Sequence, residues 1–248
     1  MIKIDMPDAP KILIDNKGIW TNSLLDAVKK YGSYSNIPQD EKSKLLVHYR
    51  HSDIQKLLFD SSYQKCAFCE CKPGECGNIE VEHFAPKSLY PELAFEWSNL
   101  LPSCRKCNEA KLNYDTKNNP IVNPAKENPE EFFTYNLLRI TPISGCGEEK
   151  KAQTTIDVCN LNCERLYNAR AILMKSITEY MDELTDKLSW IFEADTDQKK
   201  KYRITRLKNS LAVIEGLMEA DAPYSAYSKW LIEQSDSYKK AKSLISNQ

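Results

Sequence analysis

The sequence predicts an α+β protein that is mostly helical. Apolar residues recur every three or four positions over long stretches, most regularly after residue 162, which indicates amphipathic helices. Only 7 of the 248 residues are glycine, and this disfavours a β-rich fold with many tight turns. Between residues 64 and 113 the cysteines cluster and a short alternating segment indicates a strand. We therefore expect a small α+β module set among helices.

The first part of the chain, residues 1–62, is predicted to be an N-terminal helical region. Residues 1–20 contain two prolines, which favour an extended lead-in. A short apolar face predicts a helix over 22–31, and polar residues just before it are candidate caps. Apolar side chains at nearly helical spacing predict further helix over 39–60.

The second part, residues 63–115, is predicted to be the α+β module. Apolar and polar residues alternate from Ile79 to Phe84 and predict a short strand, which Pro86 ends. Residues 104–113 contain neither proline nor glycine and predict a short helix.

The third part, residues 116–248, is predicted to be a loop-rich segment followed by a helical region. Three Asn-Pro pairs predict turns within 118–150, and residues 132–140 are a candidate strand. The apolar stripe after residue 162 is a packing face, either within this chain or against a partner. Helices are predicted over 162–191 with Asn162 as the cap, over 198–219, and over 223–235.

Composition excludes several classes of protein. The formal net charge is -1, so a strongly basic nucleic-acid coat is absent and any nucleic-acid site must be a local patch. Hydrophobic residues make up 42% and charged residues 28%, which excludes wholesale disorder. No apolar run approaches the roughly 20 residues that span a bilayer, and the N-terminus has no apolar signal segment. We therefore expect a cytoplasmic protein without a membrane partner.

Nine cysteines are the most distinctive feature of the composition. In a cytosolic chain, clustered thiols are more often metal ligands than disulfides. Two C-x-x-C pairs, Cys66 with Cys69 and Cys104 with Cys107, have the spacing that lets both thiolates of a pair face one ion. Together they predict a structural zinc site with four cysteine ligands, because buried free thiols do not explain two such pairs in so short a span.

Cys71 and Cys76 leave the ligand set partly open, because either can replace Cys69 at this spacing. We prefer the two C-x-x-C pairs and treat Cys71 and Cys76 as spare thiols. The remaining cysteines have no partner pattern and are predicted to pack in the core: Cys146, Cys159 and Cys163.

Four polar residues lie between or beside the cysteine pairs: Glu82, His83, Asn99 and Asn108. A carboxylate together with an amide oxygen suits a hard divalent cation such as Mg²⁺. A single imidazole nearby can act as a general base on water. Because such a cation also stabilises the charge that develops on a phosphate, these groups are the parts that phosphodiester hydrolysis needs.

The block C-x-x-C … E-H-F-x-P-K-S … W-x-N-L-L-P-S-C-x-x-C-N-x-x-K resembles an HNH nuclease, a ββα-metal fold. The resemblance implies that residues 63–115 form this module around a structural Zn²⁺ and a catalytic Mg²⁺ or Mn²⁺. By that resemblance, His83 corresponds to the general base and Asn99 to the residue that holds its imidazole. Glu82 and Asn108 correspond to the metal ligands.

Three cations on the predicted helix that follows are candidate phosphate contacts: Arg105, Lys106 and Lys111. The sequence also departs from the family pattern. Many HNH motifs have Asp at the position of Glu82 and His at that of Asn108. Both residues here offer oxygen ligands, which makes Mg²⁺ the expected catalytic ion rather than zinc. The glycine pair that often follows P-x-S is replaced by Leu89-Tyr90-Pro91, so substrate contacts in that loop are not carried over.

Most of residues 1–170 is similar to the retron-associated and Septu-type HNH proteins of bacterial anti-phage defence. The similar segments are Lys3–Pro10, Tyr63–Glu70 and the pattern from Thr155 to Arg170. The resemblance implies an ABC- or SMC-like ATPase partner, and in some members a retron reverse transcriptase with its RNA–DNA hybrid.

These observations favour a metal-dependent endonuclease that cleaves DNA or RNA and acts with a partner. The near-zero net charge disfavours tight autonomous binding of nucleic acid, because that affinity depends largely on phosphate neutralisation. The alternative is a catalytically inactive zinc-binding module for protein or RNA. That scaffold needs only the four paired cysteines, whereas an enzyme also needs Glu82, His83, Asn99 and Asn108.

Overall fold

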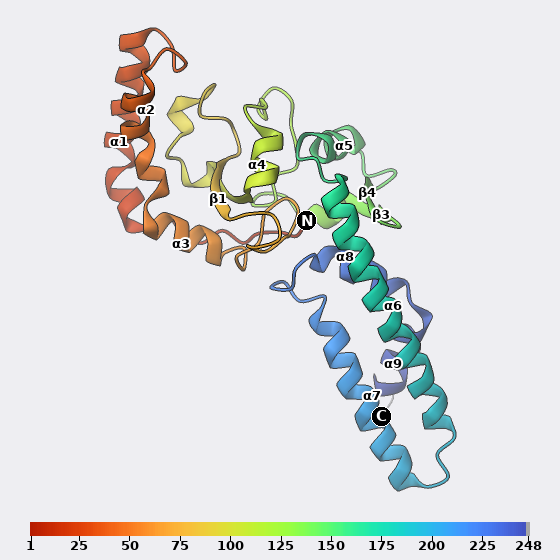
Figure 1. Ribbon diagram of the computed structural model, residues 1–248. Coiled ribbons are helices and arrows are strands. Elements are labelled where there is room, and N and C mark those ends of the chain that lie inside the picture. Colours follow the sequence, from red (N-terminus) through yellow and green to blue (C-terminus); the bar gives the residue numbers. More distant parts are fainter. Residues whose placement is uncertain (247–248) are drawn as a thin grey trace. The chain divides into compact units, whose positions relative to one another are not determined.

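A computed structural model describes residues 1–246, and it divides the chain into two compact units. The first unit comprises residues 1–134 and 140–162, and the described part of the second comprises 135–139 and 163–246. The first unit groups the predicted N-terminal region and the predicted module with the loop-rich segment. The fold is α+β and mostly helical, as the sequence predicts, with two small two-stranded sheets (Figure 1).

The first unit opens with helix α1 (Lys11–Tyr31), which is longer than the sequence predicts. The expected extended lead-in to residue 20 is wrong beyond Pro10. This proline caps the helix in an extended conformation, and its carbonyl accepts the amides of Leu13 and Ile14. Gly32 ends α1 with a φ of 80°, a conformation that costs glycine little.

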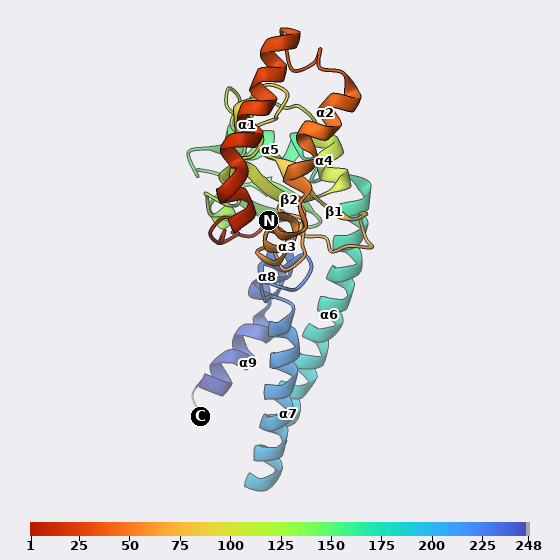
Figure 2. The same ribbon diagram turned by 90° about the vertical axis from the view of Figure 1, so that its left-hand side faces the viewer.

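Two further helices follow, α2 (Gln39–Leu46) and α3 (Ser52–Asp60), joined by a 3-10 turn at Val47–Arg50. They confirm the helical prediction for 39–60. Helices α1 and α2 lie side by side (Figure 2). The buried faces of these helices share one apolar core with the cysteine-rich module. The members of this core include Leu13, Leu24, Ile54, Leu58, Phe95 and Leu100.

The module itself has the order strand, strand, helix. Strand β1 (Ile79–His83) pairs antiparallel with β2 (Leu100–Cys104), so that Ile79 faces Cys104 and His83 faces Leu100. Helix α4 (Arg105–Lys111) begins directly after β2. The predicted strand and short helix are both confirmed. The residue pattern did not locate the second strand, which only the resemblance to a ββα module implies.

The rest of the first unit is irregular until α5 (Glu149–Val158). The predicted strand over 132–140 is two strands, β3 (Phe133–Asn136) and β4 (Arg139–Pro142), which form the second sheet. Leu137 has a φ of 52°, so the chain turns where a single strand was expected.

The second unit is helical, with α6 (Glu164–Phe192), α7 (Asp197–Gly216), α8 (Ser225–Gln234) and α9 (Asp236–Ser246). The three helices predicted in this region are confirmed. The cap prediction is wrong: Cys163 is the N-cap of α6, and the Asn162 amide instead bonds the backbone of Ile140 at 3.0 and 2.9 Å.

Helix α6 packs against the other three helices of its unit, so its apolar stripe is covered within this chain. The core of this unit includes Ile177, Leu184, Leu188, Leu207, Leu211 and Ile232. No helix within residues 1–246 is both long and apolar enough to cross a membrane.

Candidate functional site

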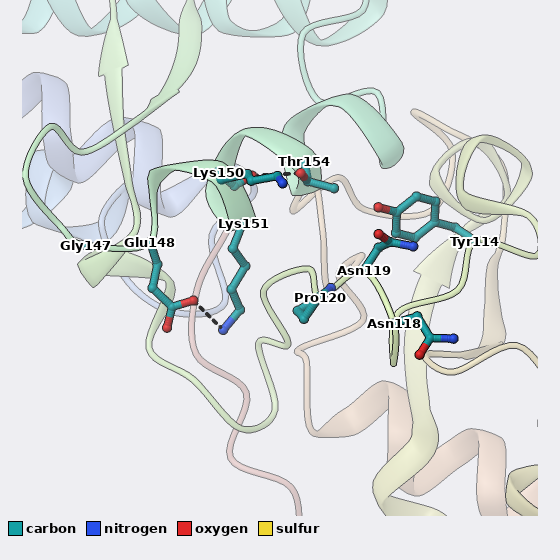
Figure 3. A pocket seen from close by; sticks show the side chains of 9 residues that line it. All are labelled: Tyr114, Asn118, Asn119, Pro120, Gly147, Glu148, Lys150, Lys151 and Thr154. Atoms are coloured by element: carbon teal, nitrogen blue, oxygen red, sulfur yellow. Dashed lines mark hydrogen bonds and ion pairs between the residues drawn. The ribbon is translucent and has the colours of Figure 1, made fainter.

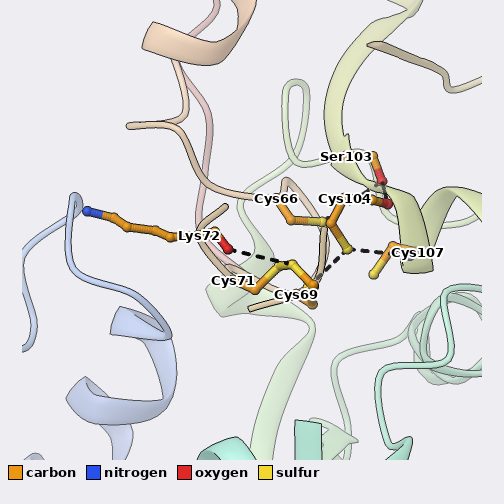
Figure 4. The surroundings of a disulfide bond; sticks show 8 residues. Cys66, Cys69, Cys71, Lys72, Ser103, Cys104 and Cys107 are labelled. Atoms are coloured by element: carbon orange, nitrogen blue, oxygen red, sulfur yellow. Dashed lines mark hydrogen bonds between the residues drawn. A yellow bond between two sulfur atoms is a disulfide. The ribbon is translucent and has the colours of Figure 1, made fainter. Parts of the chain in front are cut away.

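The two C-x-x-C pairs meet at one end of the β1–β2 sheet (Figure 4). In the first pair, the chain turns back so that the Cys66 amide donates to the Cys71 carbonyl. The Ala67 amide donates to the Pro102 carbonyl at 2.8 Å, which fixes this turn to β2. In the second pair, Cys104 ends β2 and its sulfur accepts the amide of Cys107 from the first turn of α4. Secondary structure therefore positions both pairs.

The four sulfurs are buried and lie within 4.8 Å of one another: Cys66, Cys69, Cys104 and Cys107. A tetrahedral zinc with Zn–S bonds of about 2.3 Å holds its sulfurs about 3.8 Å apart. The Cys69 and Cys104 sulfurs are 3.8 Å apart, so the donor set fits zinc. Hydrogen bonding to Cys104 raises the pKa of both Cys69 and Cys107, and a bound cation would supply the charge that lets these thiols ionise.

Cys71 and Cys76 are not spare thiols, because they form a disulfide with each other. Figure 4 shows this disulfide beside the four free thiols. In the disulfide form neither sulfur competes with Cys69 as a thiolate ligand. Both nevertheless lie within 4.8 Å of the Cys69 and Cys104 sulfurs, in a second group of four.

The remaining cysteines lie outside both groups. Cys159 is buried as a free thiol, and burial raises its pKa, as expected for a packing residue. Cys146 and Cys163 are half-buried free thiols.

His83 is the last residue of β1 and is almost completely buried. Its Nε2 lies 2.9 Å from the Ala94 carbonyl oxygen, which only accepts, so Nε2 carries the proton and Nδ1 keeps its lone pair. The ring meets Tyr49 edge-on, with centroids 4.6 Å apart. Burial lowers the pKa of His83 to about 3. The imidazole is therefore neutral near pH 7, which is the state that a general base requires.

Asn99 does not hold the imidazole, contrary to what the resemblance implies. Its carboxamide accepts the Ala85 amide at 2.7 Å and donates to the Ala85 and Leu93 carbonyls at 3.0 and 3.1 Å. The side chain thus links the end of the β1–β2 loop to its start. The Ala94 carbonyl, within the same loop, holds the His83 ring. Asn99 supports His83 only through this backbone.

Glu82 is buried and paired with Lys111, whose ammonium lies 2.7 Å from the carboxylate. The same ammonium donates to the His83 carbonyl at 2.9 Å. Burial raises the pKa of Glu82, against the attraction of Lys111 that lowers it. The phosphate contact expected of Lys111 does not fit this placement, because its charged end is bonded inside the protein.

Asn108 and Arg105 lie on α4. The Asn108 amide donates to Glu80 at 2.8 Å, which leaves its side-chain oxygen available as a ligand. Arg105 is exposed and pairs with Glu109 at 2.7 Å. Lys106 pairs with the same carboxylate at 3.3 Å. These two cations keep the surface position that a phosphate contact needs, although Glu109 neutralises part of their charge.

Glu82, His83 and Asn108 line one cavity of about 260 Å³. The loop after β1 contributes Pro86 and Lys87, α4 also contributes Glu109, and the turn after α4 contributes Leu112 and Asn113. Of the four residues singled out for chemistry, the structure brings three to this cavity and places Asn99 behind it.

Lys87 is a site residue that our sequence reasoning missed. It lines the cavity, and its ammonium is 5.5 Å from the centre of the Tyr49 ring. Burial lowers the pKa of Lys87, whereas the nearby Glu82 carboxylate raises it. The available signal was its place in the E-H-F-x-P-K-S block, three residues beyond the predicted strand.

The chain is similar to Septu proteins PtuB. It shares 38% identity over 138 residues with PtuB of Bacillus thuringiensis, which covers 54% of this chain and 51% of that relative. It shares 27% identity with PtuB of Bacillus mycoides strain KBAB4, over 91% of this chain and 88% of that relative. The first match thus spans about half the length of the relative.

A third similarity is to protein ea31 of Escherichia phage lambda, with 34% identity over 85 residues, or 25% of that protein. No protein-family profile matches the chain. The two PtuB similarities support the Septu-type resemblance of the sequence.

Proposed function

We propose that this chain is a metal-dependent HNH endonuclease that serves a Septu-type anti-phage defence system. The observation that carries the proposal is the buried, neutral His83, whose Nδ1 lone pair is left free by the Ala94 contact, beside Glu82 and Asn108 at one cavity. The strand–strand–helix order and the four clustered sulfurs add support, because a ββα-metal module uses both. The PtuB similarities support the biological setting.

The donor set at the cavity fits a catalytic Mg²⁺ or Mn²⁺. Glu82 offers a carboxylate and Asn108 an amide oxygen, and Mg²⁺ is commonly held by one or two protein oxygens together with waters and substrate phosphate. When bound there, the ion would stabilise the departing 3′ oxygen. Lys111 remains the internal counter-charge of Glu82 and holds its carboxylate in place.

The chain's own residues supply the remaining chemistry. His83 takes a proton from the attacking water at Nδ1, while Ala94 holds the opposite ring nitrogen. Lys87 lies at the same cavity and offers a cation to the phosphate. Asn99 fixes the loop from β1 to β2, and through this loop the orientation of the His83 ring.

The proposed function also requires a partner. The net charge of -1 provides little general attraction for nucleic acid, so a partner brings the substrate or licenses cleavage. The resemblance implies an ABC- or SMC-like ATPase, and in retron systems a reverse transcriptase with its RNA–DNA hybrid. Strong, unregulated cutting by the purified chain alone would contradict this regulation.

The deciding experiment is His83→Ala, assayed with Mg²⁺ or Mn²⁺ on plasmid DNA and on RNA, with and without the co-expressed ATPase. We expect cleavage to fall by about 10²- to 10⁴-fold, because the general base is lost. His51→Ala is the matched control, since the His51 side chain is 40% exposed and lies outside the cavity. Unchanged cleavage by a folded, zinc-containing His83→Ala protein would refute the catalytic assignment.

One observation favours the inactive zinc module as a second candidate. Lys111 already neutralises Glu82, and Glu80 already engages the Asn108 amide, so the site is electrostatically satisfied without a cation. If wild-type protein with its partner cleaves neither DNA nor RNA yet retains zinc and binds protein or RNA, this candidate replaces the enzyme.

A further inference from the structure

A second cavity in the first unit has no role in the proposed chemistry. It has a volume of about 410 Å³, within the range of small-ligand pockets (Figure 3). One wall is the segment after α4, which carries Tyr114 and Asn119. The other is the start of α5, which carries Lys150, Lys151 and Thr154.

Three polar groups at this cavity have no hydrogen-bond or ion-pair partner within residues 1–246: the Tyr114 hydroxyl, the Asn119 carboxamide and the Lys150 ammonium. Figure 3 shows Asn119 lying beside the Tyr114 ring, with Lys150 across from them. Lys151 differs, because Glu127 and Glu148 both pair with its ammonium. Lys150 is therefore the cation of this cavity that remains available to a ligand.

This second cavity adjoins the candidate catalytic cavity along the chain. Leu112 and Asn113 line the catalytic cavity, and the next residue, Tyr114, lines the second. Leu112 lines only the catalytic cavity of the two, and its exposure and backbone are unusual. Its side chain is 70% exposed, and its φ of 47° lies in a region that favours glycine. Backbone strain of this kind concentrates at binding sites.

We propose that the second cavity binds an unpaired nucleotide next to the phosphodiester that is cleaved. Tyr114 offers a ring on which a base stacks, Asn119 offers a donor and an acceptor to the base edge, and Lys150 offers a cation to the next phosphate. Leu112 packs between this base and its neighbour. The preferred substrate is therefore single-stranded, or has an unpaired nucleotide at this position, because a base inside a duplex cannot enter a pocket.

The inference rests on the proposed nuclease function, but binding tests it separately from cleavage. The parent protein carries His83→Ala, so that the probe stays intact. The probes are a fluorescein-labelled 15-nucleotide single strand and the same sequence as a duplex, followed by fluorescence anisotropy with Mg²⁺ at low salt. Tyr114→Ala and Lys150→Gln are the test variants, and Tyr114→Phe retains the ring. Tyr202→Ala and Lys29→Gln are matched controls, because both residues are exposed and lie elsewhere on the chain.

We expect Tyr114→Ala to weaken binding of the single strand about tenfold or more, whereas Tyr114→Phe and both controls bind like the parent. Lys150→Gln should weaken binding and reduce its salt dependence. Duplex binding should change little. The proposal is overturned if the parent does not bind the single strand in preference to the duplex, or if Tyr114→Ala binds it as tightly as the parent. Cleavage that survives His83→Ala would instead refute the assignment of His83 as the general base, and the anisotropy result would still decide the pocket.

Discussion

Lys111 has the most constrained environment of any residue at the site. Its side chain is fully buried, and its ammonium contacts the Glu82 carboxylate and the His83 carbonyl. The ion pair joins α4 to the end of β1, so it sets the distance between the strand that carries His83 and the helix that carries Asn108. Removing one partner leaves an uncompensated buried charge, which costs far more than a surface ion pair.

We predict that Lys111→Met lowers the free energy of unfolding by about 3–5 kcal/mol, because Glu82 is left buried without a counter-charge. The double variant Lys111→Met/Glu82→Gln should recover part of this loss. Urea unfolding at neutral pH measures both. Equal destabilisation of the single and double variants would show that the ion pair is not the cause.

At this scale the sequence predicted residue types better than contacts. The spacing of the cysteines and the E-H pair led to His83, Glu82 and Asn108, and these residues share one cavity. The partners of Asn99 and Lys111 were not predictable, because most are backbone groups and because the sequence does not show how α4 packs against β1. Lys87 was missed because one lysine in a loop normally indicates only solvent exposure.

Among the elements, β2 explains why half of the sheet escaped prediction. All five of its residues are buried, so the alternation that normally marks a strand is absent. It also contains Pro102, which lacks an amide proton and usually indicates a turn. Here the Pro102 carbonyl is used, since it accepts the Ala67 amide from the first cysteine pair. The helix predicted in this region was shorter than α1. Prolines favour an extended chain, whereas Pro10 directly precedes the first turn of α1.

The zinc assignment makes a prediction about these elements. Cys107→Ser should abolish binding of one zinc equivalent, measured by elemental analysis, and should remove hydrogen-exchange protection from β1, β2 and α4, which the cysteine pairs join. Cys146→Ser is the control, because Cys146 lies outside the cluster.

The paired variant Cys71→Ser/Cys76→Ser distinguishes the two groups of sulfurs. We expect it to keep a full zinc equivalent, since the preferred ligands are Cys66, Cys69, Cys104 and Cys107. Loss of zinc in this variant would assign the metal to the second group instead.

The loop between α1 and α2 predicts a response to alkaline pH. Burial raises the pKa of Tyr34 from 10.0 to about 12. Between these values the unfolded state has released the phenolic proton while the folded state retains it, so stability falls as the pH rises. Tyr34→Phe should therefore lose less stability than wild type from pH 10 to 12 in urea titrations. Parallel curves for the two proteins would contradict the burial of this hydroxyl.

On the scale of the whole molecule, the candidate site and the second helical core lie in different units. The cysteine cluster and both cavities discussed above belong to the first unit, whereas α6 to α9 have their own apolar core. The long apolar period after residue 162 made the helices of the second unit predictable. The division into two units was not predictable. Residues 135–139 belong to the second unit, although the residues on both sides of them belong to the first.

Because each unit has its own apolar core, we expect a core substitution in one unit to leave the other unit unchanged. Leu207 is fully buried in the second unit, so Leu207→Ala should destabilise that unit by about 2–5 kcal/mol. Hydrogen exchange should report faster opening of α6 and α7, while zinc content and protection of β1 and β2 stay unchanged. Val213→Ala on the exposed surface is the control. Equal loss of protection in both units would show that they unfold as one.

The separation of the two cysteine pairs along the chain also has a consequence during synthesis. Cys66 and Cys69 leave the ribosome first and wait for Cys104 and Cys107, a delay of a few seconds at roughly 5–20 residues per second. In that interval the first pair is a half-built metal site whose thiols have two near neighbours in sequence, Cys71 and Cys76. A metal held by all four paired cysteines would therefore bind only after Cys107 has emerged, which couples metal binding to completion of the module.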